Sequence, residues 1–446
     1  MNFIFAKADK EGTYMDIKRH IIEILNREIK PAIGCTEPVA VALNTAYGVS
    51  ILPNDSKEIS KITVEVSKGI YKNGMDVGIP NTNKIGLHIA ASLGASIGDP
   101  KCGLEILGKI TNEELKYSEK ILESCEINVK VDKDNNKPVY IKTTIENKNH
   151  VSVAITEDKH DNIVLLSIDG NEILNKRNGA SKENNNDNEE QNFYSLPINT
   201  IVEEIEKLNY EDIKFLLDGM EMNMNIAKEG LDKKHGLGVG YSYNSNMKNG
   251  LISKDFVNLA YALTAAASDV RMSGYSMPVM SSSGSGNNGL TAILPLAAYK
   301  EIIKISDEDL VKALAISHII TSYVKRYIGR LSNLCGCSIA ASIGSGAAIA
   351  WLLGDKNAIT STINNIIANQ AGVICDGAKP SCALKLGTAA STAVQSALLA
   401  IEGITIKDFN GIVDNQVEKS IRNLAKLSGE GMKNIDDTVI EIMLNR

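Results

Sequence analysis

Hydrophobic and polar residues follow one pattern in the first 175 residues and another in the rest of the chain. INVKVDK, PVYIKTTIE, HVSVAITE and NIVLLSID, between residues 127 and 169, alternate with the period of half-buried strands, as does KITVEVSKGI at residues 61–70. Helical spacing is seen in IKRHIIEILNR, VAVALNTAYGV and KIGLHIAASLGASIG. We therefore predict an α+β domain over residues 16–175 with an antiparallel sheet.

The segments on either side of this domain differ from it in composition. Residues 1–15 lack the basic start, long apolar run and cleavage site of a secretory signal, so we expect a disordered extension, with Met15 as an alternative start. Residues 176–192, KRNGASKENNNDNEEQN, contain almost no apolar side chain. Because such a segment buries too little surface to fold, we predict a polar linker between two domains.

From residue 193 to residue 446 the pattern is helical, and no strand is expected after about Thr200. The exceptions are loops such as GYSMPVMSSSGSGNNG. Leu334–Gly354 carries no charge, but glycine and serine dilute it, so we expect a buried helix rather than a membrane span. The predicted fold class is an α+β N-terminal domain followed by a mainly α-helical C-terminal domain.

Composition narrows the functional classes. The net charge is −7, and no basic block interleaves with aromatic residues, which argues against nucleic-acid binding. The chain has seven cysteines and no export signal. Because cytosolic thiols stay reduced, these cysteines indicate metal binding or catalysis rather than disulfides. We expect a cytoplasmic protein.

Four of the cysteines lie close together in the helical region. Cys335 and Cys337 open the uncharged helix, and Cys375 and Cys382 flank a turn-rich loop. Thiolates from two such loops can close around a metal, whereas an isolated cysteine is more often a small buried hydrophobe. The spacing fits zinc poorly and suits an iron–sulfur cluster better. Whether three or four thiolates bind stays open from spacing alone.

Two further segments have features of a reactive site. Cys35, in PAIGCTEPVAVAL, lies at a predicted helix N-terminus, where the helix dipole would lower its thiol pKa and favour a role as base or nucleophile; the alternative is a cysteine without a role. The loop SSSGSGNNG at residues 281–289 offers N–H groups, hydroxyls and amides to an anion, or is a flexible polar loop. The histidines show no metal-binding spacing, and GLGVG at 236–240 is too short for a nucleotide fingerprint.

Several segments together resemble a known family. GCTEP, VGIPNTN, SSSGSGNNG, IGRLSNLCGCSIAASIGSGAAIAWLLG and GVICDGAKPSCALKLGTAAS stand in the order seen in L-cysteine desulfidases of the UPF0597 type, relatives of the iron–sulfur L-serine dehydratases. The resemblance covers almost the whole chain from about Asp16. It implies a [4Fe–4S] cluster held by three cysteines, with the fourth iron free for the substrate.

The resemblance also implies roles for particular residues. Cys337 matches the first cluster ligand of the serine dehydratases, and Cys375 and Cys382 match the other two, which leaves Cys335 outside the cluster. Cys35 stands where the serine dehydratases carry histidine. The desulfidases also have cysteine at this position, and this favours cysteine as the substrate. The substrate carboxylate is expected to bind a set of polar residues: Thr36, Ser283, Ser285, Asn287 and Asn288.

The expected reaction removes sulfide from L-cysteine and gives pyruvate, ammonia and hydrogen sulfide, with Cys35 taking the Cα proton. Residues 193–446 are then an all-helical, cluster-binding catalytic domain. The alternatives are an L-serine dehydratase, a pyridoxal-phosphate lyase with SGSGNNG as phosphate cup, and a non-catalytic metal-binding protein that uses all four C-terminal cysteines. We expect a small amino acid as substrate, a homodimer, and no nucleic-acid or membrane partner.

Overall fold

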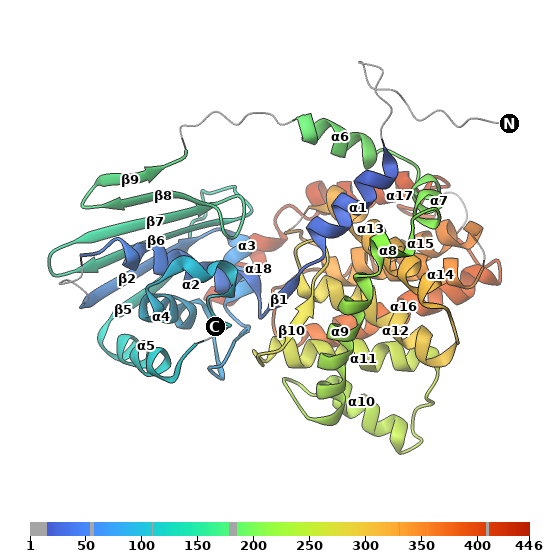
Figure 1. The fold of residues 1–446 in the computed structure, drawn as a ribbon, viewed down its shortest axis with the longest axis horizontal. Helices are drawn as coiled ribbons and strands as arrows, with labels where there is room; N and C mark the ends of the chain where they lie inside the picture. Colours follow the sequence, from blue (N-terminus) through green and yellow to red (C-terminus); the bar gives the residue numbers. More distant parts are fainter. Residues whose placement is uncertain are drawn as a thin grey trace.

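The computed structural model describes residues 16–53, 58–108, 110–177, 185–329, 331–354, 356–406 and 410–446. Two units lie side by side (Figure 1): a layered unit of strands and helices from the N-terminal region and a unit of helices from the C-terminal region. This agrees with the predicted order of a mixed α and β region followed by a mainly helical one. The predicted extension over residues 1–15 lies outside the described residues.

The N-terminal unit is built on one sheet, which has the strand order β5-β2-β6-β7-β8-β9 in the described part of the chain. Its strands are β2 (Ile59–Val66), β5 (Glu126–Val131), β6 (Tyr140–Asn147), β7 (Val151–Glu157), β8 (Ile163–Ile168) and β9 (Asn171–Asn175). β2 and β5 run parallel, and the other neighbours are antiparallel. The alternating pattern predicted β5 to β8, and the sheet is mixed rather than purely antiparallel.

The strand predicted over residues 61–70 is too long at its C-terminal end. β2 ends at Val66, and α3 (Lys68–Gly74) begins two residues later. Ser67 lies at the junction, where its hydroxyl donates to the carbonyl oxygen of Pro138 at 2.9 Å. The residues of α3 from Ile70 onward are buried. Because a short buried helix carries the same apolar signal as a strand, the pattern did not separate the two.

Helices cover one face of the sheet. α2 (Thr36–Ser50) contacts β6 and β7, α4 (Leu87–Ile97) packs on α2, and α5 (Asn112–Ser124) packs on α4 (Figure 1). The shorter elements of this unit are β3 (Gly78–Ile79), β4 (Lys84–Ile85) and η1 (Pro100–Glu105). Pro38 lies in the first turn of α2, where proline costs no helical hydrogen bond. The helices predicted over VAVALNTAYGV and KIGLHIAASLGASIG are confirmed.

The contact between α2 and α4 depends on Gly94. A Cβ atom at this position would lie 2.1 Å from the carbonyl oxygen of Ala42, which belongs to the backbone and cannot rotate away. Gly94→Ala is expected to lower the free energy of unfolding by about 1–3 kcal/mol because the two helices must separate. Urea unfolding checks this, with Gly429→Ala as control, since a Cβ there meets no atom within 4 Å. Equal stability of the two variants would contradict the packing argument.

The C-terminal unit is a bundle of helices around α11. α11 packs against α9, α12 and α16, and α14 packs against α13, α15 and α16. The helices are α7 (Ile198–Glu206), α8 (Tyr210–Ile213), α9 (Leu216–Asp232), α10 (Val239–Lys248), α11 (Phe256–Met272), α12 (Gly286–Ile302), α13 (Asp307–Ile328), η2 (Cys337–Ala341), α14 (Ser342–Leu352), α15 (Lys356–Gln370), α16 (Cys382–Ile401), α17 (Val417–Lys426), η3 (Leu427–Gly431) and α18 (Ile435–Leu444).

Two predictions for the second half of the chain are corrected. No strand was expected after about Thr200, but β10 (Pro278–Met280) pairs antiparallel with β1 (Pro31–Ile33) of the N-terminal region. Its partner is remote in sequence, so no local alternation marks it. Part of the predicted linker is helical, because α6 (Asn185–Phe193) overlaps it, while residues 178–184 lie outside the described residues. Phe193 at the end of α6 is fully buried and anchors the helix.

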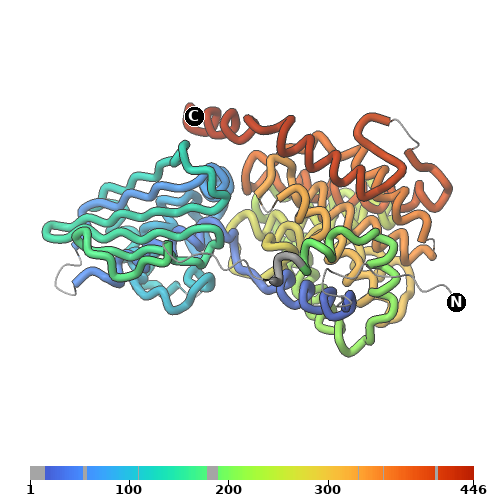
Figure 2. Tube along the Cα trace, turned by 90° about the horizontal axis from the view of Figure 1, so that it is seen from above, coloured from blue at the N-terminus to red at the C-terminus, as the bar shows by residue number. Residues whose placement is uncertain are grey.

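Two segments cross from one unit to the other. α1 (Ile17–Glu28) precedes the sheet in sequence but packs on α7 and α13 of the helical unit, with Ile21 and Leu25 in its core. α18 ends the chain against α3 of the N-terminal unit, as the red tube in Figure 2 shows. The first helix of the chain thus packs on the C-terminal unit and the last helix on the N-terminal unit. The domain boundaries near residues 175 and 193 stay a prediction.

In the part of the chain that the structure describes, one helix, α16, is long and apolar enough to cross a membrane. It packs against α11, α14 and α15, and 56% of its most apolar window is buried, as in the core helix of a globular protein. The uncharged segment Leu334–Gly354 forms η2 and α14, and both are largely buried within the bundle. The expectation of a buried helix there is confirmed.

Candidate iron–sulfur site

The two cysteine segments pair with each other in space. Leu334 and Ile374 form an antiparallel bridge, with the amide of Cys335 donating to Val373 O at 2.9 Å and the amide of Cys375 donating to Asn333 O at 2.8 Å. Cys337 is the first residue of η2 and Cys382 the first residue of α16. Backbone hydrogen bonds thus hold all four cysteines of the helical unit in one region.

The four thiols are free and affect one another electrostatically. A hydrogen bond with Cys335, together with burial, raises the pKa of Cys337, and the charges of Cys382 and Cys375 add to this effect. The same hydrogen bond lowers the pKa of Cys335, and Ser338 donates to its sulfur at 3.3 Å. Burial raises the pKa of Cys382 to about 12, and the charges of Cys335 and Cys375 add to it. Four thiols close enough to shift one another's pKa values are suited to binding a cationic centre.

The all-thiolate donor set suits an iron–sulfur cluster. Thiolates around a single tetrahedral zinc ion lie about 3.8 Å apart, given metal–sulfur bonds of about 2.3 Å. Within the described ranges, no group of three or more histidine, cysteine, aspartate and glutamate side chains is arranged to hold one ion. An iron–sulfur cluster separates its cysteine ligands further than a single ion does and prefers an all-thiolate donor set. The donor chemistry of this site therefore fits such a cluster.

Basic side chains surround the thiols. The Nζ of Lys385 donates to Asp376 Oδ1 at 2.5 Å and to Ile374 O at 3.0 Å, and Lys379 pairs with the same carboxylate. Burial would raise the pKa of Asp376, but the hydrogen bonds from these two lysines outweigh it and lower that pKa. A Cβ at Gly336 would lie 3.2 Å from the Nζ of Lys325. Such positive charge stabilises thiolates and an anionic cluster.

Cys35 reaches the helical unit through the pairing of β1 with β10. Pro31 pairs with Met280, and both the amide and the hydroxyl of Ser281 donate to Lys30 O. The loop before α2 is therefore held against the serine-rich loop of the second unit. Cys35 occupies the N-cap position of α2, as predicted, but its side chain makes no capping hydrogen bond.

The predicted lowering of the Cys35 thiol pKa is wrong. Burial raises the pKa of its thiol to about 11, and the charge of Arg271 opposes this only in part, while Glu37 adds to it. The side chain is 3% exposed. The N-terminus of a helix lowers a thiol pKa when water also solvates the sulfur; here the cost of desolvating the thiolate is larger.

Alkylation tests this state of Cys35. At pH 8 a thiol with a pKa of about 11 is ionised in about one molecule in a thousand, so Cys35 is expected to react with iodoacetamide far more slowly than the exposed Cys102. Its rate is expected to rise with pH up to about 11, because the thiolate is the reacting form. Peptide mass spectrometry of the reduced protein measures both rates. Equal rates at the two cysteines would contradict a buried, neutral Cys35.

The predicted carboxylate-binding residues occupy two loops that meet. Ser285 caps α12 by accepting from the amide of Asn288 at 3.5 Å. Ser283 has a positive φ of 49° and shares a hydrogen bond of 2.8 Å with Ser322. Asn287 accepts from Arg271 and is oriented by it. Within the described part of the chain, the side chains of Thr36 and Asn288 have no hydrogen-bond partner.

Of these residues, Asn288 lies beside the Cys335–Cys337 segment. A Cβ at Gly336, between Cys335 and Cys337, would lie 3.4 Å from Asn288 Oδ1. The structure therefore joins the serine-rich loop to the cysteine segments at this point. Thr36 lies on the other side, in the first turn of α2 beside Cys35.

Arg271, at the end of α11, was missed in the sequence. Its guanidinium donates to Gly34 O and to Asn287 Oδ1, both at 2.8 Å, and the residue is 4% exposed. Among the described residues it has no carboxylate partner, and its Nε has no hydrogen-bond partner. Arg271 thus holds the Cys35 loop and the serine-rich loop together as a buried cation. The available signal was an arginine in ALTAAASDVRM, a segment rich in small and apolar residues.

Arg271→Lys is expected to lower the free energy of unfolding by about 1–3 kcal/mol. A lysine keeps the charge, but its single ammonium does not reproduce the planar fork that serves two acceptors, so one buried acceptor is left unpaired. Urea unfolding measures the change. Arg326→Lys is the matched control, because Arg326 is exposed and the same substitution there should be near neutral. A neutral Arg271→Lys would remove the bridging role.

The glycine-rich segment GLGVG has a structural explanation. The amide of Gly240 donates to Asp269 Oδ2 at 2.9 Å, and the amides from Leu237 to Val239 also face this carboxylate. Burial raises the pKa of Asp269 to about 6 in spite of these hydrogen bonds. The nest of amides before α10 therefore binds a carboxylate of the chain itself.

His318 supports the serine-rich loop from behind. Its Nδ1 lies 2.9 Å from Ser282 Oγ, and burial lowers the pKa of the imidazole to about 3, so the ring is neutral. Its Nε2 has no partner among the described residues. No role had been predicted for this histidine, and the structure places it at the base of the loop.

Comparison with known proteins agrees with this arrangement. Residues 101–441 match the serine dehydratase alpha chain family. The chain is 44% identical to a UPF0597 protein of Clostridioides difficile strain 630, over 95% of this chain and 98% of that protein. A UPF0597 protein of Alkaliphilus oremlandii is 45% identical over 96% and 99%, and one of Clostridium botulinum strain Hall is 41% identical over 96% and 97%.

The fold and the site define a class of protein in which a helical bundle with two paired cysteine loops is joined to a mixed α and β unit. The chain belongs to the serine dehydratase alpha chain family. Membership indicates a lyase of the serine dehydratase type, a family that generally depends on iron and sulfur.

Proposed function

We propose that the chain is an iron–sulfur-dependent lyase that removes sulfide from L-cysteine and releases pyruvate, ammonia and hydrogen sulfide. The observation that carries the proposal is a continuous chain of contacts from Cys35 to the thiols. Arg271 joins Gly34 O to Asn287, and the neighbouring Asn288 lies beside Gly336 between two cysteines. Two loops of the helical unit and one of the N-terminal unit would form one site.

Cys337, Cys375 and Cys382 would hold the [4Fe–4S] cluster, and Cys335 would stay outside it, hydrogen-bonded to Ser338. Three thiolates rather than four are proposed because of the resemblance to the serine dehydratases. When bound, the cluster would supply an iron with an open position, which acts as a Lewis acid on the leaving sulfur.

Cys35 would accept the proton from Cα of the substrate. The electron pair of that C–H bond then forms the double bond to Cβ, and sulfide leaves with the electron pair of the Cβ–S bond. The aminoacrylate tautomerises to an imine, and water hydrolyses it to pyruvate and ammonia. Arg271 is the positive charge that favours a thiolate at Cys35, so base catalysis depends on it.

The substrate carboxylate would bind at the meeting of the two loops. Thr36, Ser283, Ser285, Asn287 and Asn288 are the proposed donors, and Thr36 and Asn288 support the proposal best because their side chains have no competing partner among the described residues. A ligand held at two points beside a reactive group gains most of its acceleration from orientation.

The second candidate function is an L-serine dehydratase, which expels hydroxide instead of sulfide. The family match favours it, because the family takes its description from that reaction. Cys35 favours the first candidate, since the resemblance places a histidine there in serine dehydratases. We expect either enzyme to be a cytoplasmic homodimer acting on a small amino acid, without a nucleic-acid or membrane partner.

The test is anoxic purification, reconstitution with iron and sulfide, and an assay of products from L-cysteine and from L-serine. Sulfide and pyruvate in equal amounts from L-cysteine, with loss of activity in air, is the expected result. Pyruvate from L-serine without sulfide from L-cysteine would identify the dehydratase. No product from either substrate, with the cluster intact, would refute both candidates.

A further inference from the structure

Three ion pairs and a buried isoleucine hold the C-terminal helix α18 against the N-terminal unit. Lys72 pairs with Asp436 at 2.6 Å, Lys68 with Asp437 at 2.5 Å, and Arg446 with Asp76 at 2.8 Å. Ile440 is the buried residue of the helix. A cavity of about 380 Å³ lies beside it, lined by α3, β5 and the end of α18, so the apolar packing there is incomplete.

The three ion pairs differ in exposure. The side chain of Lys72 is 2% exposed and that of Asp436 is 23% exposed, whereas Lys68 and Asp437 are 29% and 53% exposed. An exposed pair contributes little, because water and salt screen it. Removing the carboxylate partner of a buried lysine is strongly destabilising, because the lysine charge is then left without a counter-charge and without water. The Lys72–Asp436 pair is therefore the one that matters most for α18.

Lys72 also contacts the loop that carries Cys375. A Cβ at Gly377, two residues after Cys375, would lie 2.1 Å from the carbonyl oxygen of Lys72, so the loop packs directly on the backbone of α3. Burial raises the pKa of Cys375, and the charge of Lys72 acts in the opposite direction. The Cys375 loop thus packs on the backbone of Lys72 across the boundary between the units, and the charge of Lys72 acts on Cys375.

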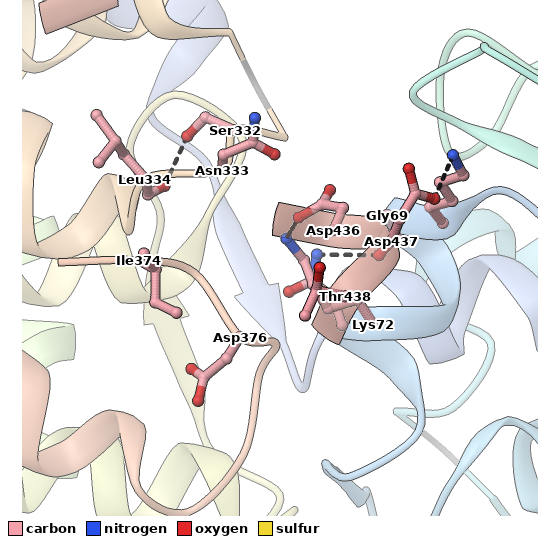
Figure 3. A network of polar contacts seen from close by, with 12 residues as sticks. Gly69, Lys72, Ser332, Asn333, Leu334, Ile374, Asp376, Asp436, Asp437 and Thr438 are labelled. Carbon is pink, nitrogen blue, oxygen red and sulfur yellow. Dashed lines mark hydrogen bonds and ion pairs between the residues drawn. The ribbon is translucent and has the colours of Figure 1, made fainter. Parts of the chain in front are cut away.

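The same C-terminal segment holds the other cysteine loop. The Nδ2 of Asn333, just before Leu334 and Cys335, donates to Ser428 O at 3.0 Å. Figure 3 shows Asn333, Ile374 and Asp376 on the loops, and Lys72 beside the acidic first turn of α18. Residues 428–436 therefore contact the segment before Cys335 directly and the Cys375 loop through Lys72.

We propose that α18 is a latch between the two units, in which Asp436 fixes Lys72 as a positioning residue for the Cys375 loop. Closing the latch completes the thiol site with a residue of the N-terminal unit. Opening it frees the Cys375 loop from α3. That the thiols then hold a cluster rests on the proposed function, whereas the order of the loop does not.

Hydrogen exchange of the cluster-free, reduced protein tests the latch. Lys72→Met and Asp436→Asn are each expected to speed exchange roughly tenfold in peptides that cover residues 373–382, because the buried pair is broken. Asp437→Asn is the matched control. It lies on the same helix and removes an exposed pair, so it should loosen α18 slightly and leave the loop unchanged.

The double variant Lys72→Met with Asp436→Asn keeps the test valid if one single variant fails to fold. If the pair acts as one unit, the double variant exchanges no faster than either single variant. Unchanged exchange at residues 373–382 in both single variants would overturn the proposal. An equal effect of Asp437→Asn would also overturn it, because it would assign the effect to α18 as a whole rather than to Lys72.

A second readout uses the loaded protein without measuring turnover. Under anoxic conditions with an iron chelator, Lys72→Met and Asp436→Asn are expected to lose cluster absorbance roughly tenfold faster than the unchanged protein and Asp437→Asn. Equal rates in all four proteins would overturn the positioning role. If neither the wild-type protein nor any variant binds a cluster, the proposed function is refuted. Hydrogen exchange then tests the proposed latch by itself.

Discussion

Cys375→Ala is expected to abolish both the iron–sulfur absorbance and the turnover of the reconstituted protein. Cys375 lies on the loop that pairs with the Cys335 segment, and its amide donates to Asn333 O, so the thiol is held in place before any metal binds. Removing one of three proposed thiolate ligands leaves an iron without a protein donor, and metal affinity depends on the complete ligand set. Iron content and visible absorbance after anoxic reconstitution measure the loss.

Two controls separate a cluster ligand from a structural cysteine. Cys102→Ala changes an exposed thiol in the N-terminal unit and should have no effect. Cys335→Ala removes a buried thiol beside Cys337 and is expected to keep the absorbance, because three ligands are proposed. Loss of the cluster in Cys335→Ala would favour a closed site of four thiolates. Retention of the cluster in Cys375→Ala would refute the proposed ligand set.

Cys35→Ser is expected to abolish turnover while the cluster absorbance stays intact. A serine hydroxyl has nearly the same size as a thiol, but its pKa is far too high for it to accept a proton from Cα at neutral pH. Cys35 is separated from the cysteine loops by Arg271, Asn287 and Asn288, so its replacement should not disturb the ligands. Turnover and absorbance measured on one preparation check both parts of the prediction.

The pH profile adds a second readout for Cys35. Burial places its pKa at about 11 without substrate, so the thiolate needed for base catalysis becomes more abundant as the pH rises toward that value. Turnover is expected to increase with pH in the unchanged protein. Unchanged turnover in Cys35→Ser would remove this residue from the mechanism, and loss of cluster absorbance would give it a structural role instead.

The period of the apolar residues predicted most of the secondary structure, and the missed strand β10 and the misassigned helix α3 have physical causes. β5 and β6 alternate clearly and β7 and β8 alternate in part, and α1, α2 and α4 carry the helical spacing. β10 has three residues and exists because β1 lies beside it, and the residues of α3 from Ile70 onward are all buried. A pattern reports one buried face, so it fails where the whole segment is buried or where the partner is distant in sequence.

The sequence predicted the reactive residues of the candidate site but not the basic residues around them. The cysteine segments, Cys35 and the serine-rich loop are compact motifs with an unusual composition, and each was visible in the sequence. Arg271, Lys72, Lys325 and Lys385 each lie in a helix, where a basic residue reads as a surface charge. Only the packing of the helices shows that the first three are buried and that all four face the loops.

The sequence by itself determined the order of the two regions, the strands that alternate, the family resemblance and the set of thiols that can bind a metal group. The tertiary structure alone decided which segments meet and what their surroundings do to them. Cys35 shows the difference: its local position at a helix N-terminus predicts a lowered pKa, but the helical unit covers it and burial raises the pKa to about 11. Helix position is a local property, whereas desolvation depends on every element that packs around the group, including those hundreds of residues away.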